Sequence, residues 1–421
     1  MPGFEGWRAA APDARILFAT RMVRMVAYGL LSVVLVLYLA EVGLSAQRIG
    51  LLLTLTLAGD TVISLWMTTS ADRRGRRKML MVGALLMVFA GVLFAVTRDF
   101  GVLLLAAIIG VISPSGNEVG PFLSIEQASL AHLSAHTQHT RVFAWYNVAG
   151  SFAVAGGTLA GGGLAQWGRN LGVPPLATYR VIVLLYAALG VVLALLFLRL
   201  SPAVEVSQHR SAQAPGERTF LGLHRSRGIV LKLAALFGLD AFAGGFVMQS
   251  LLVYWFHLRF GLEAGFLGAV FAAANILAGI SALSAARLAA RFGLINTMVF
   301  THLPSNVLLI LVPLMPNAGL AILVLLARFA ISQMDVPTRQ AYTVSVVEPD
   351  ERSAAAGVTG IARSIGAGIA PLLVGRLLAS SSLLNVPLFL AGGLKIIYDL
   401  LLYRSFRSTT RREAELTRFT R

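Results

Sequence analysis

Long apolar runs, each about the length of a membrane-crossing helix, alternate along the chain with short polar segments. A helix needs roughly 20 apolar residues to cross about 30 Å of hydrocarbon. The pattern therefore predicts an all-α integral membrane protein with twelve transmembrane helices. The predicted helices lie at residues 16–40, 48–70, 79–97, 101–125, 142–166, 180–200, 229–256, 264–286, 296–315, 318–345, 354–378 and 385–403.

Basic residues gather in alternate loops, which gives the chain an orientation. One set of loops carries Arg8, Arg15, Arg73, Arg74, Arg76, Arg77, Lys78, Arg141, Arg210, Arg218, Arg225, Arg227, Arg287, Arg291, Arg352 and the tail from Arg404 to Arg421. The other set carries Arg48, Arg98, Arg169 and Arg259, with Arg180 at a boundary. Cytoplasmic loops are enriched in Lys and Arg. We therefore expect a multi-pass protein of the inner (plasma) membrane with both termini in the cytoplasm.

Composition supports the bilayer as the main partner of this chain. Apolar residues make up 57% and charged residues 13%, against a charged share of about 25% in soluble proteins. The net charge of +16 is spread over short blocks between apolar runs, which argues against nucleic-acid binding. With no cysteine, the chain has no disulfide and no thiolate metal site. We expect a monomer with no cofactor and no metal.

The longest polar stretch divides the chain into two halves. We predict an N-terminal six-helix bundle at 1–200, a cytoplasmic linker at 201–228, a C-terminal six-helix bundle at 229–403 and a basic tail at 404–421. Small-residue segments recur at similar places in the halves, as "GGTLAGGG" at 156–163 and "GAGIAP" at 366–371. Internal repeats of this kind are common in secondary transporters. The two bundles are therefore expected to be pseudo-symmetric.

The loop between the second and third predicted helices contains the segment "ADRRGRRK" at 71–78. This segment resembles the cytoplasmic signature of the major facilitator superfamily, and five of its residues match: Asp72, Arg73, Gly75, Arg76 and Arg77. The family's glycine four residues before the aspartate is replaced here by Thr68. The resemblance extends to the twelve helices, the basic central loop and "EPDERSAAAG" at 348–357.

The resemblance implies a gating network in this loop. In the family, the aspartate and the arginine four residues later join an acid at the cytoplasmic end of the fourth helix, which here would be Glu126. Asp72, Arg76 and Glu126 would then latch the two halves in the outward-facing state. The alternative is that the loop is only a topology signal of positive charge.

An ionisable group inside a membrane-crossing helix costs free energy, so we expect each such group to have a structural or functional role. Burial disfavours the charged form of a carboxylate and a nearby arginine favours it, so an acid between these effects can exchange a proton. Glu118, Asp240 and Asp335 are the candidates for proton coupling. The alternative is permanent pairing with arginines that only orders the bundle.

The resemblance also implies that helices one, four, seven and ten line a central cavity. The polar residues on those helices that we predict to line a substrate cavity are Arg24, Asn117, Gln249, Arg328 and Gln333.

Other charged residues are expected to be structural. Asp60 could pair with Arg363, and Lys395 with Asp399, its neighbour four residues on along the same helix.

Three functions remain open. The favoured one is a secondary active transporter that works by alternating access and exports small amphipathic organic compounds in exchange for protons. The second is proton-coupled uptake of a small polar solute or organic anion. The third is a membrane sensor that transports nothing. An enzyme is not expected, because no nucleophile–base pair or metal cluster is apparent.

Overall fold

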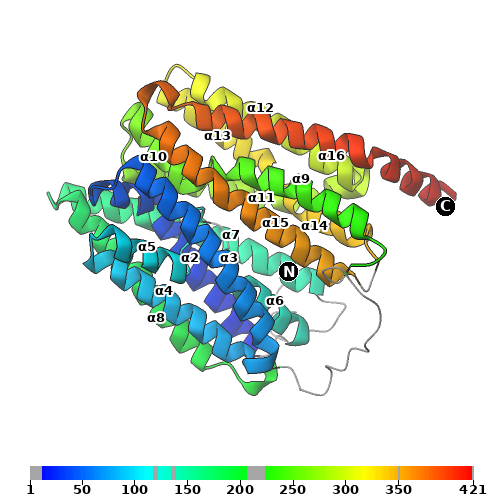
Figure 1. Ribbon diagram of the computed structural model, residues 1–421, viewed down its shortest axis with the longest axis horizontal. Coiled ribbons are helices and arrows are strands. Elements are labelled where there is room, and N and C mark those ends of the chain that lie inside the picture. Colours follow the sequence, from blue (N-terminus) through cyan, green and yellow to red (C-terminus); the bar gives the residue numbers. More distant parts are fainter. Residues whose placement is uncertain (1–11, 117–121, 134–138, 206–222, 349–350, 420–421) are drawn as a thin grey trace, which may run out of the picture. The chain divides into compact units, whose positions relative to one another are not determined.

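The computed structural model describes residues 12–116, 122–133, 139–205, 223–348 and 351–419 (Figure 1). This part of the chain is built of helices and forms no β-strand. Eleven helices in it are long and apolar enough to cross a membrane, and Phe100–Ile109 is a shorter apolar helix. The predicted all-α membrane architecture is therefore confirmed.

The chain folds into two compact units. The first comprises Met1–Ala214 and Gln249–Ala272, and the second comprises Pro215–Met248 and Ala273–Arg421. The segment 249–272, which we predicted within the C-terminal bundle, thus groups with the first unit.

The helices of the first unit are α2 (Pro12–Glu41), α3 (Ala46–Arg74), α4 (Arg76–Val96), α5 (Phe100–Ile109), α6 (Phe122–Leu133), α7 (His139–Asn170), α8 (Pro175–Leu198), η2 (Pro202–Val204) and α10 (Gln249–Phe260), followed by the first part of α11 (Ala264–Phe292).

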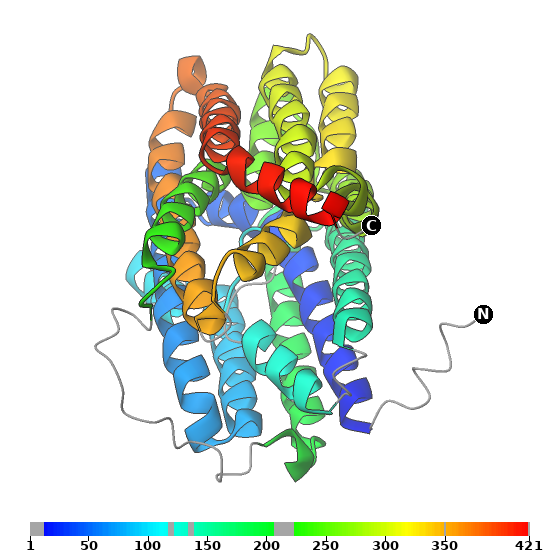
Figure 2. The same cartoon turned by 90° about the vertical axis from the view of Figure 1, so that its right-hand side faces the viewer.

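The second unit contains α9 (Arg227–Gly245), the rest of α11, α12 (Leu294–Leu311), η4 (Val312–Leu314), α13 (Ala318–Ser332), α14 (Asp335–Ser345), α15 (Arg352–Leu378), η5 (Ser381–Leu383) and α16 (Val386–Phe419). The last helix continues well past residue 403, where we predicted its end (Figure 2).

Three of the predicted helices are interrupted. The helix predicted at 101–125 ends at Ile109, because Pro114 cannot donate a helical hydrogen bond and Gly116 has a φ of 69°. The helix predicted at 318–345 breaks between α13 and α14, and the one predicted at 229–256 breaks between α9 and α10. Discontinuous helices are typical of the substrate and ion sites of transporters.

Glycines allow the first long helix of each unit to pack closely on a partner. A Cβ on Gly157 of α7 would lie 2.1 Å from the carbonyl oxygen of Val26 on α2. In the second unit, a Cβ on Gly366 of α15 would lie 2.2 Å from the carbonyl oxygen of Gly238 on α9. The helices α9 and α15 accordingly lie side by side (Figure 1). The two small-residue segments seen in the sequence therefore have the same packing role.

The close contact at Gly366 predicts a stability difference between two glycines of the same helix. Gly366→Ala forces α15 away from α9 and should lower the unfolding temperature, since overpacking costs about 1–3 kcal/mol. Gly360→Ala is the control, because a Cβ there meets nothing within 4 Å. Thermal unfolding of the purified variants in detergent measures the difference. Equal unfolding temperatures for the two variants would contradict the packing argument.

Candidate functional site

The carboxylate of Asp240 on α9 is the centre of a buried charge cluster in the second unit. Its side chain is 4% exposed. Lys395 of α16 donates to Oδ1 at 2.5 Å, while Arg339 of α14 and Arg363 of α15 donate to Oδ2 at 3.2 and 3.3 Å. One carboxylate therefore joins α9 to three other helices. Removing one partner from a buried ion pair typically costs about 3–5 kcal/mol, because it leaves an uncompensated charge, so the burial of Asp240 makes the fold depend on these cations.

Arg339 also binds the second predicted coupling acid. Its Nη1 lies 2.9 Å from Oδ2 of Asp335, which precedes it by four residues on α14. The guanidinium stands over the ring of Phe237, 5.5 Å from the centroid. Arg339 thus bridges Asp335 and Asp240, and the structure brings two of the three predicted coupling acids together.

A histidine and a third aspartate extend the cluster. His302 of α12 has its Nδ1 2.8 Å from Oδ1 of Asp399 on α16, and Asn306 donates to Oδ2 of Asp399 at 2.9 Å. The other ring nitrogen of His302, Nε2, lies 4.0 Å from Oδ1 of Asp240. The chain of groups runs from Asp399 through His302 to Asp240 and Lys395.

The predicted pairing of Lys395 with Asp399 was wrong, because each of them has a partner on another helix. The proposed partner of Asp60, Arg363, hydrogen-bonds to Asp240. The signal that could have revealed the cluster is polar residues four apart inside apolar runs, as at His302 and Asn306 or Asp335 and Arg339.

Arg328 and Ser332 lie four residues apart on α13 and are 8% and 4% exposed. The Nε of Arg328 and the Oγ of Ser332 have no hydrogen-bond partner among the described residues. The buried polar groups of a protein are normally satisfied. The four cations Arg328, Arg339, Arg363 and Lys395 also outnumber the three carboxylates of the cluster. This excess of positive charge makes Arg328, which we predicted to line the substrate cavity, a candidate anion site.

In the first unit, Glu126 of α6 is fully buried and bound to Arg24 of α2. The guanidinium donates to Oε1 at 2.8 Å and to Oε2 at 2.7 Å, Thr20 donates to Oε1 at 2.8 Å, and Tyr146 donates to Oε2. The structure thus pairs a predicted cavity residue with a predicted latch residue. The two units carry charges of opposite sign on their first long helices. In the first unit, α2 carries the cation Arg24, and in the second unit, α9 carries the acid Asp240.

Arg76, another residue of the predicted latch, lies at the start of α4. Its backbone N–H donates to Oε2 of Glu205 at 2.6 Å, and the N–H of Arg77 donates to Oε1 at 3.2 Å. Glu205 thus caps the N-terminus of α4, where a carboxylate is favoured by the helix dipole. A Cβ on Gly75, whose φ is 101°, would lie 3.2 Å from this carboxylate. Arg73 is exposed, and the side chain of Asp72 lies outside the described residues.

The remaining predicted cavity residues are divided between the units. Gln249 of α10 donates to Oγ of Ser32 at 2.7 Å in the first unit. In the second unit, the backbone N–H of Gln333 donates to Ser281 at 3.3 Å. Asn117 and the third coupling candidate, Glu118, lie outside the described residues.

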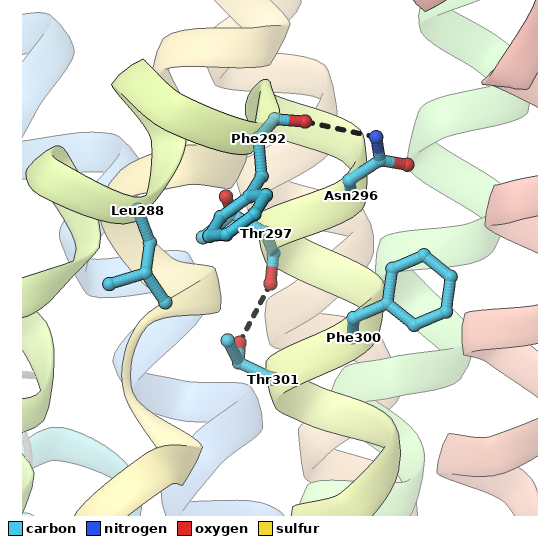
Figure 3. A pocket seen from close by; sticks show the side chains of 6 residues that line it. All are labelled: Leu288, Phe292, Asn296, Thr297, Phe300 and Thr301. Carbon is cyan, nitrogen blue, oxygen red and sulfur yellow. Dashed lines mark hydrogen bonds between the residues drawn. The ribbon is translucent and has the colours of Figure 1, made fainter.

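A surface pocket between α11 and α12 is separate from the charge cluster. It is lined by Leu288, Phe292, Asn296, Thr297, Phe300 and Thr301 (Figure 3). Asn296 donates to the carbonyl of Phe292 at 2.9 Å, and Thr301 donates to that of Thr297 at 2.8 Å. Because this lining has no charged group and these polar side chains already bond to backbone carbonyls, the pocket is a weak candidate for the site.

The apolar helices and the charges buried among them define a polytopic membrane protein. The sequence profile of the Major Facilitator Superfamily matches residues 17–371. The chain therefore belongs to this family and is a secondary transporter of its type.

Known relatives agree with the family assignment. The chain is 30% identical to the uncharacterized membrane protein YJR124C of Saccharomyces cerevisiae over 426 residues, which cover 95% of each chain. An 85-residue segment is 34% identical to the quinolone resistance protein NorA of Staphylococcus aureus, covering 20% of this chain and 22% of NorA. Among solved structures, the nucleoside transporter NupG superposes with a TM-score of 0.71 at 13% identity, covering 94% of this chain and 99% of NupG.

Glu351 makes a second carboxylate cap, outside the membrane-spanning helices, at the N-terminus of α9. It accepts hydrogen bonds from the backbone N–H groups of Arg225 at 2.9 Å and Ser226 at 2.8 Å, and from the backbone and ring of His224. Burial raises the pKa of Glu351, but the hydrogen bonds from Ser226 and His224 outweigh it and hold the pKa well below its usual range.

The lowered pKa of Glu351 predicts a pH-dependent contribution to stability. A carboxyl whose folded pKa lies below the unfolded value of about 4.3 stabilises the fold above that pH and loses the effect as pH falls. Glu351→Gln should therefore lower the unfolding temperature by the same amount at neutral and mildly alkaline pH, and by less in strong acid. Glu348→Gln, at an exposed neighbour, is the control. A difference that grows on acidification would contradict the assignment.

Proposed function

We propose that this chain is a proton-coupled transporter that exports small amphipathic organic compounds by alternating access. The observation that carries the proposal is the buried carboxylate of Asp240, which holds cations from three other helices of the second unit. Both termini are placed in the cytoplasm on the strength of the alternating basic loops. The latch of Asp72, Arg76 and Glu126 stays part of this proposal.

Charge neutralisation gives the cluster its coupling capacity. A proton added to the cluster changes the attraction between Asp240 and the helices that carry Lys395, Arg339 and Arg363. About 1.4 kcal/mol shifts a two-state equilibrium tenfold, and a broken buried ion pair supplies more than that. Proton binding and helix position are therefore linked, and the linkage is reciprocal.

The export direction is supported by two observations. An 85-residue segment of this chain is similar to NorA, a protein that is named for quinolone resistance. The chain is also rich in apolar residues, at 57%, which suits an amphipathic cargo.

A second candidate function is proton-coupled uptake of an organic anion. Arg328 favours it, because its buried guanidinium has an unsatisfied Nε and Ser332, four residues further along α13, has an unsatisfied hydroxyl. A carboxylate of a substrate could accept hydrogen bonds from both groups and would neutralise the excess charge.

The coupling role of Asp240 predicts loss of proton movement in Asp240→Asn. Purified protein is placed in liposomes with a pH-sensitive dye inside, and a quinolone, benzoate and a neutral sugar are added in turn. Solute-triggered proton movement should appear in wild type and fall at least about tenfold in the variant, as loss of one charge pair implies. The control is Glu263→Gln, because Glu263 is 45% exposed and pairs with Arg169 at the surface.

The outcomes of this experiment separate the functions. If protons entering the liposomes drive the solute out, the result supports export in exchange for protons. If the solute enters the liposomes together with the protons, the result supports uptake. Proton movement that is unchanged in Asp240→Asn contradicts the coupling role. If labelled solute equilibrates without any proton movement, the chain is a facilitator.

The anion site predicts a charge-selective binding defect. Arg328→Gln should weaken binding of benzoate at least about tenfold, the effect expected for one charge-assisted hydrogen bond, and should leave binding of neutral benzamide unchanged. Equilibrium binding to the purified protein measures both ligands, and Arg287→Gln on the exposed face of α11 is the control. Equal benzoate affinity in wild type and Arg328→Gln would exclude this site.

A further inference from the structure

We propose that His302 is the group that carries the coupled proton, on its Nε2 atom, between Asp399 and Asp240. This inference rests on the proposed proton coupling and names the site within the cluster where the proton binds. His302 lies on α12 and is 4% exposed. It was not among the candidates that the sequence suggested.

Several titratable and charged groups belong to the same cluster as the imidazole. They are Lys395, Tyr398 and Asp399 on α16, Asp240 on α9, Arg328 on α13, Asp335 and Arg339 on α14, and Arg363 on α15. The two carboxylates of Asp399 and Asp240 lie 2.8 and 4.0 Å from the ring nitrogens. The cations oppose protonation, but Arg363 has a side chain that is 36% exposed and is screened by solvent.

The hydrogen bonds define where an added proton goes. With Asp399 ionised, Nδ1 of His302 carries a proton, and this N–H donates a hydrogen bond to Oδ1 of Asp399. The amide of Asn306 donates a hydrogen bond to Oδ2. Nε2 then has a lone pair that faces Oδ1 of Asp240, so two acceptors face each other. A proton on Nε2 turns this repulsion into attraction.

The other members of the cluster are less suited to carrying the proton. Asp240 is held by three cations, and Asp335 is held by Arg339. Imidazole is the side chain that ordinarily changes its charge between about pH 5 and 8. Its Nδ1 is hydrogen-bonded to Asp399, and the neutral amide of Asn306 lies beside it.

Loading the proton would change which helices are joined. A hydronium ion gives up a proton as its O–H bond breaks, the lone pair of Nε2 forms the new N–H bond, and a water molecule is left. The neutral imidazole thereby becomes an imidazolium. Nε2 of this cation lies 4.0 Å from Oδ1 of Asp240, the same oxygen that accepts from Lys395. The link between α9 and α12 is strengthened at the expense of the link between α9 and α16. Release of the proton to water reverses the exchange.

The placement of His302 separates the proton from the substrate. The helices that we expect to line the cavity are the first, fourth, seventh and tenth, whereas α12 and α16 are the ninth and the twelfth. Asp240, on the seventh helix, connects the two regions. Substrate and proton then act on one element, α9, from different sites, as allosteric coupling requires.

Nitrogen NMR of histidine-labelled protein in lipid nanodiscs tests the proposal with the proton itself as the ligand. The signals of His302 are identified by their loss in His302→Asn, in which the amide can still donate to Asp399. In wild type they should show protonated Nδ1 and bare Nε2 at high pH, and Nε2 should gain a proton as the pH is lowered.

Transport completes the test and distinguishes this inference from the proposed function. His302→Asn should lose solute-triggered proton movement but retain solute exchange, and His257→Asn should behave as wild type, because His257 contacts a loop carbonyl outside the cluster. Unchanged proton movement in His302→Asn, or a His302 signal that stays neutral throughout, overturns the inference while proton coupling stands. Absence of proton movement in wild type overturns the proposed function itself.

Discussion

The compensation of buried charge in an apolar interior is the constraint on which this structure depends. An ionised side chain that loses water must find opposite charges and hydrogen-bond donors, or the fold loses several kcal/mol. Asp240 meets this requirement with cations from α14, α15 and α16, so its needs fix how four helices meet. Glu126 meets it with Arg24, Thr20 and Tyr146, which ties α6 to α2 and α7.

The two units solve the same problem with inverted signs. In each, a first long helix packs through glycines on a partner, α2 on α7 and α9 on α15. That first helix carries a cation, Arg24, in one unit and an acid, Asp240, in the other. The opposite charge comes in both cases from the second part of an interrupted helix, α6 or α14. Repetition of the backbone arrangement therefore does not require repetition of the residues.

The sequence predicted the helices well and their pairing poorly, for a physical reason. Apolar runs are local, so their length alone reveals membrane-crossing helices, and Pro114 marks one interruption. Pro337, near the start of α14, marks the break between α13 and α14, because it has no N–H to bond the carbonyl of Gln333. The partner of a buried charge depends on how helices are rotated against one another. Lys395 and Asp399 illustrate this, because their local spacing favours each other while tertiary packing gives them Asp240 and His302.

The two buried centres also differ in their capacity to respond to a proton. Each carboxylate oxygen of Glu126 already accepts two hydrogen bonds, so a proton there would have to displace a donor. At His302, Nε2 has Asp240 at 4.0 Å and gains an attraction on protonation. A carboxylate such as Glu126, whose hydrogen bonds are all made, holds its helices together. In the proposed arrangement, Nε2 of His302 and Oδ1 of Asp240 are both acceptors, and a proton between them would be favoured. Within the described residues, the second unit is therefore better suited to switching and the first to support.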